Sequence, residues 1–141
     1  MYTAEKRPLA GAFTLLPIDD VHYGPGALAR LEATLEHYGV TRALLVTGTT
    51  LATKTDLVDR VRVAAGGRIA AVFHETTQHV HRGSVIRAIE AARACAADGI
   101  VSFGGGTPND TGKAVVLGLA EDVAATGDFD RLRVRFEYPA T

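Results

Sequence analysis

The chain has 141 residues, which is enough for one domain and too few for two ordinary ones. Hydrophobic residues make up 47% and charged residues 22%, as in ordinary folded soluble proteins. The formal net charge of -1 argues against nucleic acid or any other partner that is held by bulk electrostatics. The single cysteine, Cys95, excludes a disulfide framework within the chain.

Two further features bear on localisation. The longest apolar run, residues 114–120, is too short to span a membrane. Lys6 and Arg7 precede only a mildly apolar stretch that prolines interrupt, and this pattern does not match a signal peptide. We therefore expect a cytoplasmic protein with no membrane partner.

Short apolar or β-branched runs alternate with longer helical patterns along the chain. In order, we expect an extended piece at 21–23, a helix at 27–38, a strand at 43–46, a loop at 47–50, a helix at 56–65, a strand at 69–73, a helix at 84–97, a strand at 100–103 and a helix from about 109 to 125. The continuous apolar runs are typical of strands that are buried on both faces. This βαβ rhythm predicts a single α/β domain with a Rossmann-like parallel sheet and flanking helices.

The end of the chain has a different period. Apolar residues at 132, 134, 136 and 138 alternate with charged ones, which predicts a half-buried strand. An unpaired apolar strand invites association, so we expect it to pair either with this domain's sheet or with a partner.

The most informative stretch is residues 103–113, where three consecutive glycines connect a predicted strand to a predicted helix. Glycines let the backbone approach a ligand closely, and the helix behind them offers free N–H groups and the positive end of its dipole. Thr107 adds a hydroxyl donor, and Asn109 and Asp110 can cap the first turn. Lys113 lies one turn later and could reach a phosphate or ribose. The stretch predicts a cradle for the pyrophosphate of a dinucleotide; a strand-to-helix turn without a ligand is the alternative.

Two better-known phosphate motifs do not fit this stretch. A Walker A loop has four residues between its first glycine and the Gly-Lys pair, but five residues separate Gly106 from Gly112, and alanine follows Lys113. The dinucleotide pattern G-x-G-x-x-G fails because Asn109 stands at the last glycine position. A looser G-x-G-x-x-A copy at 24–29 is more typical of a tight turn before a helix.

The histidines suggest a second kind of site. His74, His79 and His81 lie in one loop region, and the H-x-H spacing can place two imidazoles on the same side of an extended segment, as a zinc or iron site would require. No acidic or cysteine partner stands at ligand spacing, although Glu75 is adjacent, so solvated loop histidines near a cofactor pocket are the favoured interpretation. No Ser-His-Asp or Cys-His arrangement and no G-x-S-x-G motif indicates a nucleophile, and the catalytic residues stay unknown.

Residues 100–113 read Ile-Val-Ser-Phe-Gly-Gly-Gly-Thr-Pro-Asn-Asp-Thr-Gly-Lys. This closely resembles the segment I-V-x-x-G-G-G-S-x-x-D-x-x-K of the iron-containing alcohol dehydrogenase family. Residues 23–28, 42–47 and 97–99 extend the resemblance in the same order and spacing. The subgroup that the chain resembles most is the maleylacetate reductases and their relatives, with His79-Val80 leading into a helix.

The resemblance implies that residues 1–141 form an N-terminal dinucleotide-binding domain of an oxidoreductase. Such a domain holds NAD or NADP for hydride transfer to a small carbonyl or enone-type substrate. Gly104, Gly105, Gly106 and Thr107 would hold the pyrophosphate. The other positions that the resemblance assigns to the cofactor are Asp110 and Lys113, which match the family's Asp and Lys, together with Gly48, Thr49 and His79.

Two departures from the family pattern concern the cofactor. Thr107 replaces the usual serine and keeps its hydroxyl. Gly48 stands where many relatives carry an aspartate that binds the ribose hydroxyls and repels a 2′-phosphate. Gly48 and Thr49 therefore leave room for NADP as well as NAD.

The largest departure is the family's C-terminal helical domain, which is absent from this chain. In the family that domain usually holds a divalent metal, iron or zinc, through an aspartate and several histidines, so no metal ligands are assigned here. The resemblance implies a second chain that carries this domain, or a homo-oligomer, and an isolated chain that is inactive. The alternatives are a non-catalytic nucleotide-binding or assembly module and a degenerate remnant that binds nothing.

Overall fold

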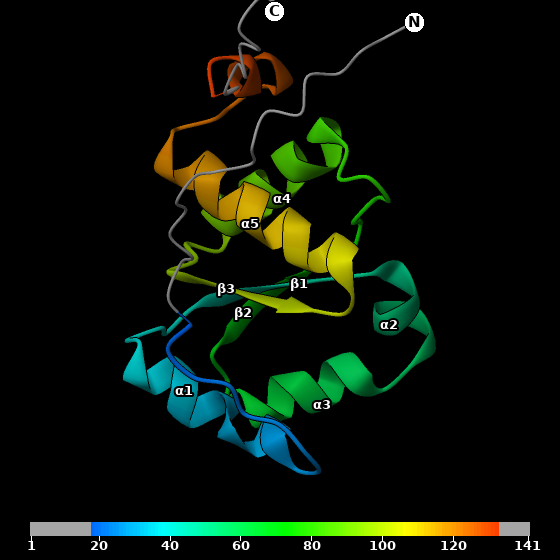
Figure 1. The fold of residues 1–141 in the computed structure, drawn as a ribbon, viewed down its shortest axis with the longest axis vertical. Helices are drawn as coiled ribbons and strands as arrows, with labels where there is room; N and C mark the ends of the chain where they lie inside the picture. The colour runs from blue at the N-terminus through cyan, green and yellow to red at the C-terminus, as the bar shows by residue number, and fades with distance from the viewer. Residues whose placement is uncertain (1–17, 133–141) are drawn as a thin grey trace, which may run out of the picture.

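A three-stranded parallel sheet with helices on both faces makes up the fold (Figure 1). The computed structural model of the chain describes residues 18–132. Its elements, in chain order, are the 3-10 helix η1 (Ala27–Arg30), α1 (Leu31–His37), β1 (Ala43–Thr47), α2 (Thr49–Lys54), α3 (Leu57–Ala64), β2 (Ile69–Phe73), α4 (Arg82–Ala94), β3 (Gly99–Phe103), α5 (Gly106–Ala120) and the 3-10 helix η2 (Thr126–Asp130). The strand order is β2-β1-β3, and both pairings are parallel. The predicted Rossmann-like α/β fold is confirmed.

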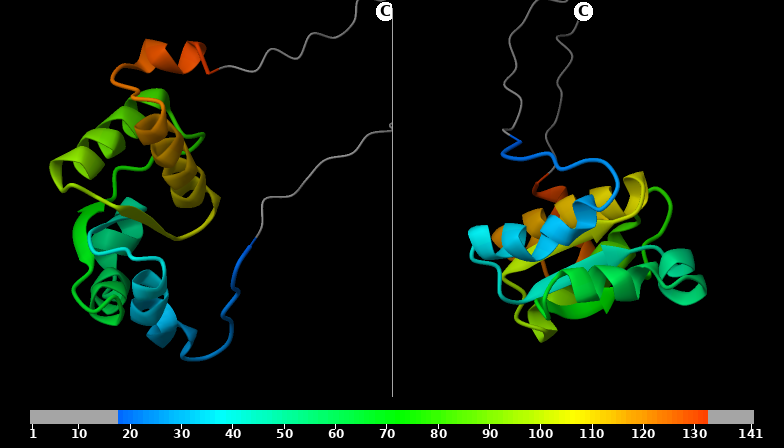
Figure 2. Two further views of the ribbon diagram at one scale, coloured as in Figure 1. Left: turned by 90° about the vertical axis from the view of Figure 1, so that its left-hand side faces the viewer. Right: turned by 90° about the horizontal axis from the view of Figure 1, so that it is seen from below.

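The central strand, β1, separates two hydrophobic cores. Leu44 and Val46 pack with side chains of α4 and α5, whereas Ala43 and Leu45 pack with side chains of α1 and α3. Successive residues of a strand point to opposite faces, so a strand that is covered on both sides needs an unbroken apolar run. The four residues predicted as a doubly covered strand, 43–46, are all buried, and β1 extends one buried residue further, to Thr47. The two helical layers are visible in Figures 1 and 2.

β3 is less buried than predicted. It forms an edge of the sheet within residues 18–132, where Ser102 is exposed and the other residues of the strand are partly buried. Val116 and Leu117 of α5 are also exposed. The sequence of β3 is as apolar as that of a central strand, but the burial of a strand depends on its neighbours, which its own sequence does not encode.

The largest differences from the predicted helices are at α2 and α5. The residues after Thr47 form the short helix α2 and not a loop, with Ala52 N–H donating to the Gly48 carbonyl at 3.1 Å. α5 begins at Gly106, three residues earlier than predicted, and ends at Ala120. Glycine and threonine are weak helix formers. Because both helices begin with these residues, the sequence pattern did not predict where they start.

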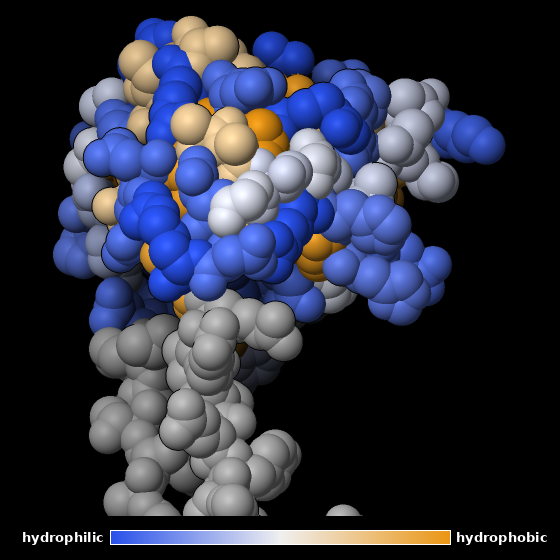
Figure 3. Space-filling view, turned by 90° about the horizontal axis from the view of Figure 1, so that it is seen from above, coloured by the Kyte–Doolittle hydropathy of each residue, from blue (hydrophilic) through white to orange (hydrophobic). Residues whose placement is uncertain are grey.

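One predicted element lies almost entirely outside the residues that the structure describes. The predicted period-two strand lies outside them except for Leu132. No helix within residues 18–132 combines the length and the apolar character that a membrane crossing requires. Seen from the end that η2 occupies, the surface is mostly hydrophilic and is broken by small apolar patches (Figure 3).

Asp98 connects the segments that precede β1 and β3 through hydrogen bonds. Its carboxylate accepts the Thr41 hydroxyl at 2.6 Å, the Arg42 N–H at 2.8 Å and the Thr41 N–H at 3.0 Å. The Thr41 hydroxyl, followed by the backbone N–H groups of Arg42 and Thr41, lowers the pKa of Asp98 from 3.8 to about 2. The loops that precede β1 and β3 are thereby joined, which supports the parallel register of these two strands.

We expect Asp98→Asn to lower the free energy of unfolding at neutral pH and to flatten its acid dependence. Because the folded pKa is depressed, the stabilisation by Asp98 is fully present above its ordinary pKa of 3.8 and is lost as the pH falls toward about 2. Urea unfolding at pH 7 and at pH 3 measures the effect. If the variant and the wild type lose equal stability between these two pH values, the assigned role of Asp98 is wrong.

Candidate functional site

The predicted site residues lie on the loops and in the helices that follow the strands at one edge of the sheet. Because the strands are parallel, the loops after β1, β2 and β3 all leave from the carboxyl edge. The chain moves from β1 to β2 on one side and then crosses to β3 on the other. The helices that follow β1 lie on one face of the sheet, and α5, which follows β3, lies on the opposite face (Figure 1). Such a topological switch point is where open α/β sheets bind ligands.

The three glycines between β3 and α5 serve different purposes. Gly104 has a φ of +136°, and a Cβ there would lie 3.0 Å from Pro108 Cγ and 3.4 Å from Leu51 Cδ1. The backbone conformation and the packing therefore both require glycine at this position. Among residues 18–132, a Cβ on Gly105 or Gly106 would meet nothing within 4 Å, so this part of the chain leaves open space beside these two residues.

The first turn of α5 presents unused hydrogen-bond donors. Among residues 18–132, no acceptor is bonded to the N–H groups of Gly105, Gly106 and Thr107. Pro108 has no N–H, and the Asn109 N–H bonds the Gly105 carbonyl at 3.4 Å. The first turn contains no acidic residue. A helix of this length has a positive end that attracts an anion, so these residues fit a pyrophosphate.

The residues expected to cap α5 do not do so. Gly105 is the N-cap residue and makes no side-chain cap bond, and Asn109 and Asp110 lie one turn into the helix. Asp110 instead forms an exposed ion pair with Lys113, with 3.1 Å between Oδ1 and Nζ. Lys113 also borders a hollow of about 330 Å³ beside Ser102 and Asn109. The structure thus brings Asp110 and Lys113 to each other, one turn beyond the glycines.

Gly48 and Thr49 lie at the end of β1, next to the loop that follows β2. Gly48 pairs with Glu75 in an isolated bridge, and a Cβ on Gly48 would have Thr76 Oγ1 as its neighbour at 3.9 Å. The Thr49 hydroxyl donates to the His74 carbonyl at 2.8 Å. Space is therefore available beside Gly48, whereas the Thr49 side chain is engaged within the protein.

In the strand order, His79 is farther from the glycine loop than Gly48 and Thr49 are. It is exposed, has a φ of 64°, and belongs to the loop after β2, which β1 separates from β3. His74 Nδ1 is buried and has no hydrogen-bond partner among the residues that the structure describes. Within residues 18–132, no three His, Cys, Asp or Glu side chains form a group that could hold a metal ion.

Two threonines at this edge of the sheet were not predicted as site residues from the sequence. Thr47 is fully buried, and its hydroxyl donates to the Phe103 carbonyl at 2.7 Å. The Thr76 hydroxyl donates to the Thr47 carbonyl at 2.9 Å. A polar residue that ends an apolar run is the one signal that could have identified Thr47, and Thr76 has no comparable signal.

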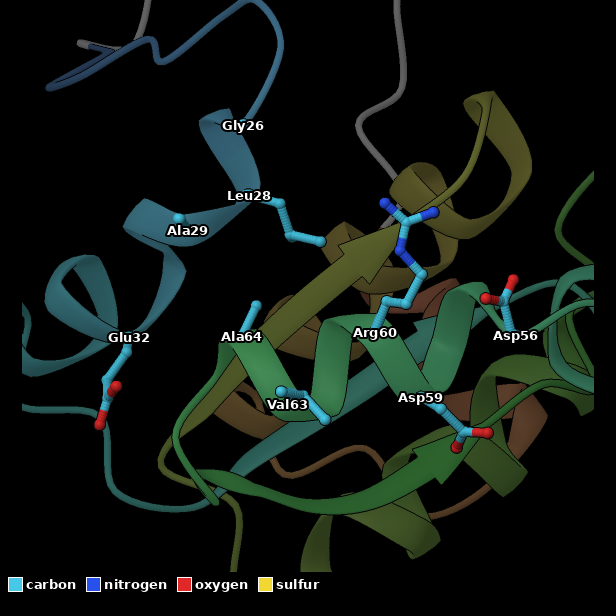
Figure 4. Close-up of a pocket in the computed structure, with 9 residues that line it drawn as sticks. All are labelled: Gly26, Leu28, Ala29, Glu32, Asp56, Asp59, Arg60, Val63 and Ala64. Carbon is cyan, nitrogen blue, oxygen red and sulfur yellow. The ribbon is translucent and has the colours of Figure 1, made fainter.

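A second hollow, of about 630 Å³, lies between η1–α1 and α3. Leu28 points from η1 toward α3, from which Arg60 and Ala64 point back (Figure 4). The lining also includes the carboxylates Glu32, Asp56 and Asp59. All three carboxylates are exposed. A groove with three carboxylates and one arginine is a poorer site for a phosphate than the start of α5.

Comparisons with known proteins identify the family of the chain. Residues 19–136 match the family model described as iron-containing alcohol dehydrogenase. A maleylacetate reductase from Pseudomonas knackmussii is 35% identical over 97 residues, which is 69% of this chain and 27% of that protein. A 4-hydroxybutyrate dehydrogenase from Cupriavidus necator is 31% identical over 97 residues, which is 69% of this chain and 25% of that protein.

The crystal structure of maleylacetate reductase from Rhizobium sp. strain MTP-10005 has the same fold. The TM-score is 0.66 at 28% identity, and the match covers 77% of this chain and 30% of that one. The chain spans about a quarter of the length of the curated relatives that it matches. On the match to 19–136 and on its fold, the chain belongs to the iron-containing alcohol dehydrogenase family.

Proposed function

We propose that this chain binds NAD(P) at the start of α5 and forms the cofactor-binding part of an oxidoreductase of its family. The observation that carries the proposal is the set of three unbonded N–H groups at Gly105, Gly106 and Thr107, at the switch point of the sheet. The open space beside Gly105 and Gly106 supports it, because a phosphate could approach the backbone there.

Each loop has a distinct task in this proposal. The N–H groups at the start of α5 bind the pyrophosphate, and the Thr107 hydroxyl adds a donor. Gly48 leaves room for the ribose that carries the 2′-hydroxyl or 2′-phosphate. The bound cofactor supplies hydride chemistry at C4 of its nicotinamide ring, and the protein's part is to hold and orient it.

The substrate class and the metal-binding domain are proposed from the relatives of this chain. Relatives are named for maleylacetate and for 4-hydroxybutyrate, so we take a small carbonyl or enone-type compound as the substrate class. A second chain with the family's C-terminal helical domain, or a homo-oligomer, would complete the enzyme. Any iron or zinc would be bound by ligands of that domain, since residues 18–132 offer no cluster for it.

Titration of the purified chain with NADH and with NADPH tests the proposal, with nicotinamide fluorescence as the readout. The protein contains no tryptophan, so its own emission is small. We expect saturable binding of both nucleotides. ADP, which carries the pyrophosphate, should compete with them, and adenosine should compete far less. The absence of saturable binding at millimolar nucleotide would refute the proposed cofactor site.

A further inference from the structure

We infer that Thr47 is a positioning residue for the cofactor loop, which it orients through a hydrogen bond to the peptide group that precedes the glycines. The inference rests on the proposed function and adds to it a residue that the glycine motif does not contain. Thr47 ends β1 and lies opposite Phe103, the last residue of β3, in the parallel register. The two residues thus meet at the carboxyl edge of the sheet.

The bond from Thr47 is short, and its donor residue is buried. Its Oγ1 donates to the Phe103 carbonyl at 2.7 Å, and the Thr47 residue is 0% exposed. Because the Thr47 side chain is buried, its hydroxyl has no competing solvent partner, and the carbonyl of the partly buried Phe103 loses its donor if that hydroxyl is removed. The Phe103 carbonyl is therefore held in one orientation.

The orientation of that carbonyl passes to the glycine loop. The peptide group between Phe103 and Gly104 is planar, so a fixed carbonyl also fixes the N–H of Gly104 on the other side of the plane. Gly104 has a φ of +136°, and glycine by itself imposes little preference on its backbone angles. The direction of the loop that leads into the first turn of α5 thus depends on the hydrogen bond from Thr47, which lies outside the loop.

Thr47 is itself held from the other side. The Thr76 hydroxyl, in the loop after β2, donates to the Thr47 carbonyl at 2.9 Å. Thr76 Oγ1 is also the atom nearest to a Cβ built on Gly48. One buried residue therefore links the ends of all three strands. These bonds fix the position of Gly48 relative to the glycine loop.

Three variants of the purified chain separate positioning from general stability. Thr47→Val keeps the shape and removes the hydroxyl, and Thr47→Ser keeps the hydroxyl. Thr111→Val is the matched control, since Thr111 is also 0% exposed and its hydroxyl donates to the Thr107 carbonyl at 2.8 Å within α5. If Thr47→Val does not fold, Thr47→Cys replaces it, because a thiol is a weaker donor of similar size.

We expect Thr47→Val to raise the Kd for NADPH and NADH by about tenfold, the effect of losing one well-placed hydrogen bond. Thr47→Ser and Thr111→Val should bind as the wild type does. In amide proton–nitrogen spectra without nucleotide, Thr47→Val should shift the resonances of Gly104 and Gly105 and leave those of α3 in place.

The two readouts distinguish the possible failures. A wild-type chain that binds no nucleotide refutes the proposed function, while the Gly104 resonance still decides whether Thr47 orients the loop. If the wild type binds and Thr47→Val binds equally well, or if Thr111→Val weakens binding to the same extent, the positioning role of Thr47 is overturned. Unchanged Gly104 and Gly105 resonances in Thr47→Val overturn it as well.

Discussion

Gly105→Asp is expected to lower the affinity of the chain for NADH and NADPH by about a hundredfold or more, the scale expected when repulsion replaces charge-assisted bonds. A side chain at this position enters open space beside the unbonded N–H groups of Gly106 and Thr107. The carboxylate would accept those N–H groups and repel the pyrophosphate. The fluorescence titration measures the loss.

The stability of this variant should not fall with its affinity for the nucleotides. Gly105 is the N-cap residue of α5, a position that aspartate favours, so thermal unfolding should be unchanged or raised. Gly83→Asp in α4 is the control, because it adds the same charge at an exposed glycine outside the predicted site. Normal nucleotide binding by Gly105→Asp would show that the first turn of α5 does not hold the phosphates.

Gly48→Asp is expected to weaken NADPH binding by at least about tenfold while NADH binding changes little, since a carboxylate beside the adenine ribose repels a 2′-phosphate and accepts the ribose hydroxyls. The backbone of Gly48, with φ -95° and ψ 152°, suits any residue. The nearest atom to an added Cβ is 3.9 Å away, so the side chain fits without displacement. The ratio of the two Kd values reports the effect.

Gly48→Asn separates charge from size in the same experiment. It has nearly the same shape without the charge, so its two Kd values should stay close to those of the wild type. Equal weakening of NADH and NADPH by Gly48→Asp would contradict the placement of the ribose beside this residue.

The sequence predicted those features that depend on local pattern. The apolar run of β1 predicted a strand covered on both faces, and the alternation of strands and helices predicted the parallel sheet. The glycines between β3 and α5 were correctly placed between a strand and a helix. Resemblance to the family supplied the interpretation of that segment, and the family match to residues 19–136 confirms the resemblance.

What the sequence did not predict depends on contacts between distant residues. The edge position of β3 follows from the order of the strands, and the short helix α2 from hydrogen bonds that Thr49 and Gly48 make after folding. The bond from Thr47 to Phe103 joins residues 56 positions apart in the chain. No spacing rule could have paired them.

The claim that cofactor binds at the start of α5 is tested most directly by amide proton–nitrogen spectra of the labelled chain during addition of NADPH. We expect the largest shifts at Gly105, Gly106 and Thr107, with a second set at Gly48 and Thr49. Shifts confined to the groove between η1–α1 and α3 would contradict it, because the ligand would then occupy a different layer of the fold.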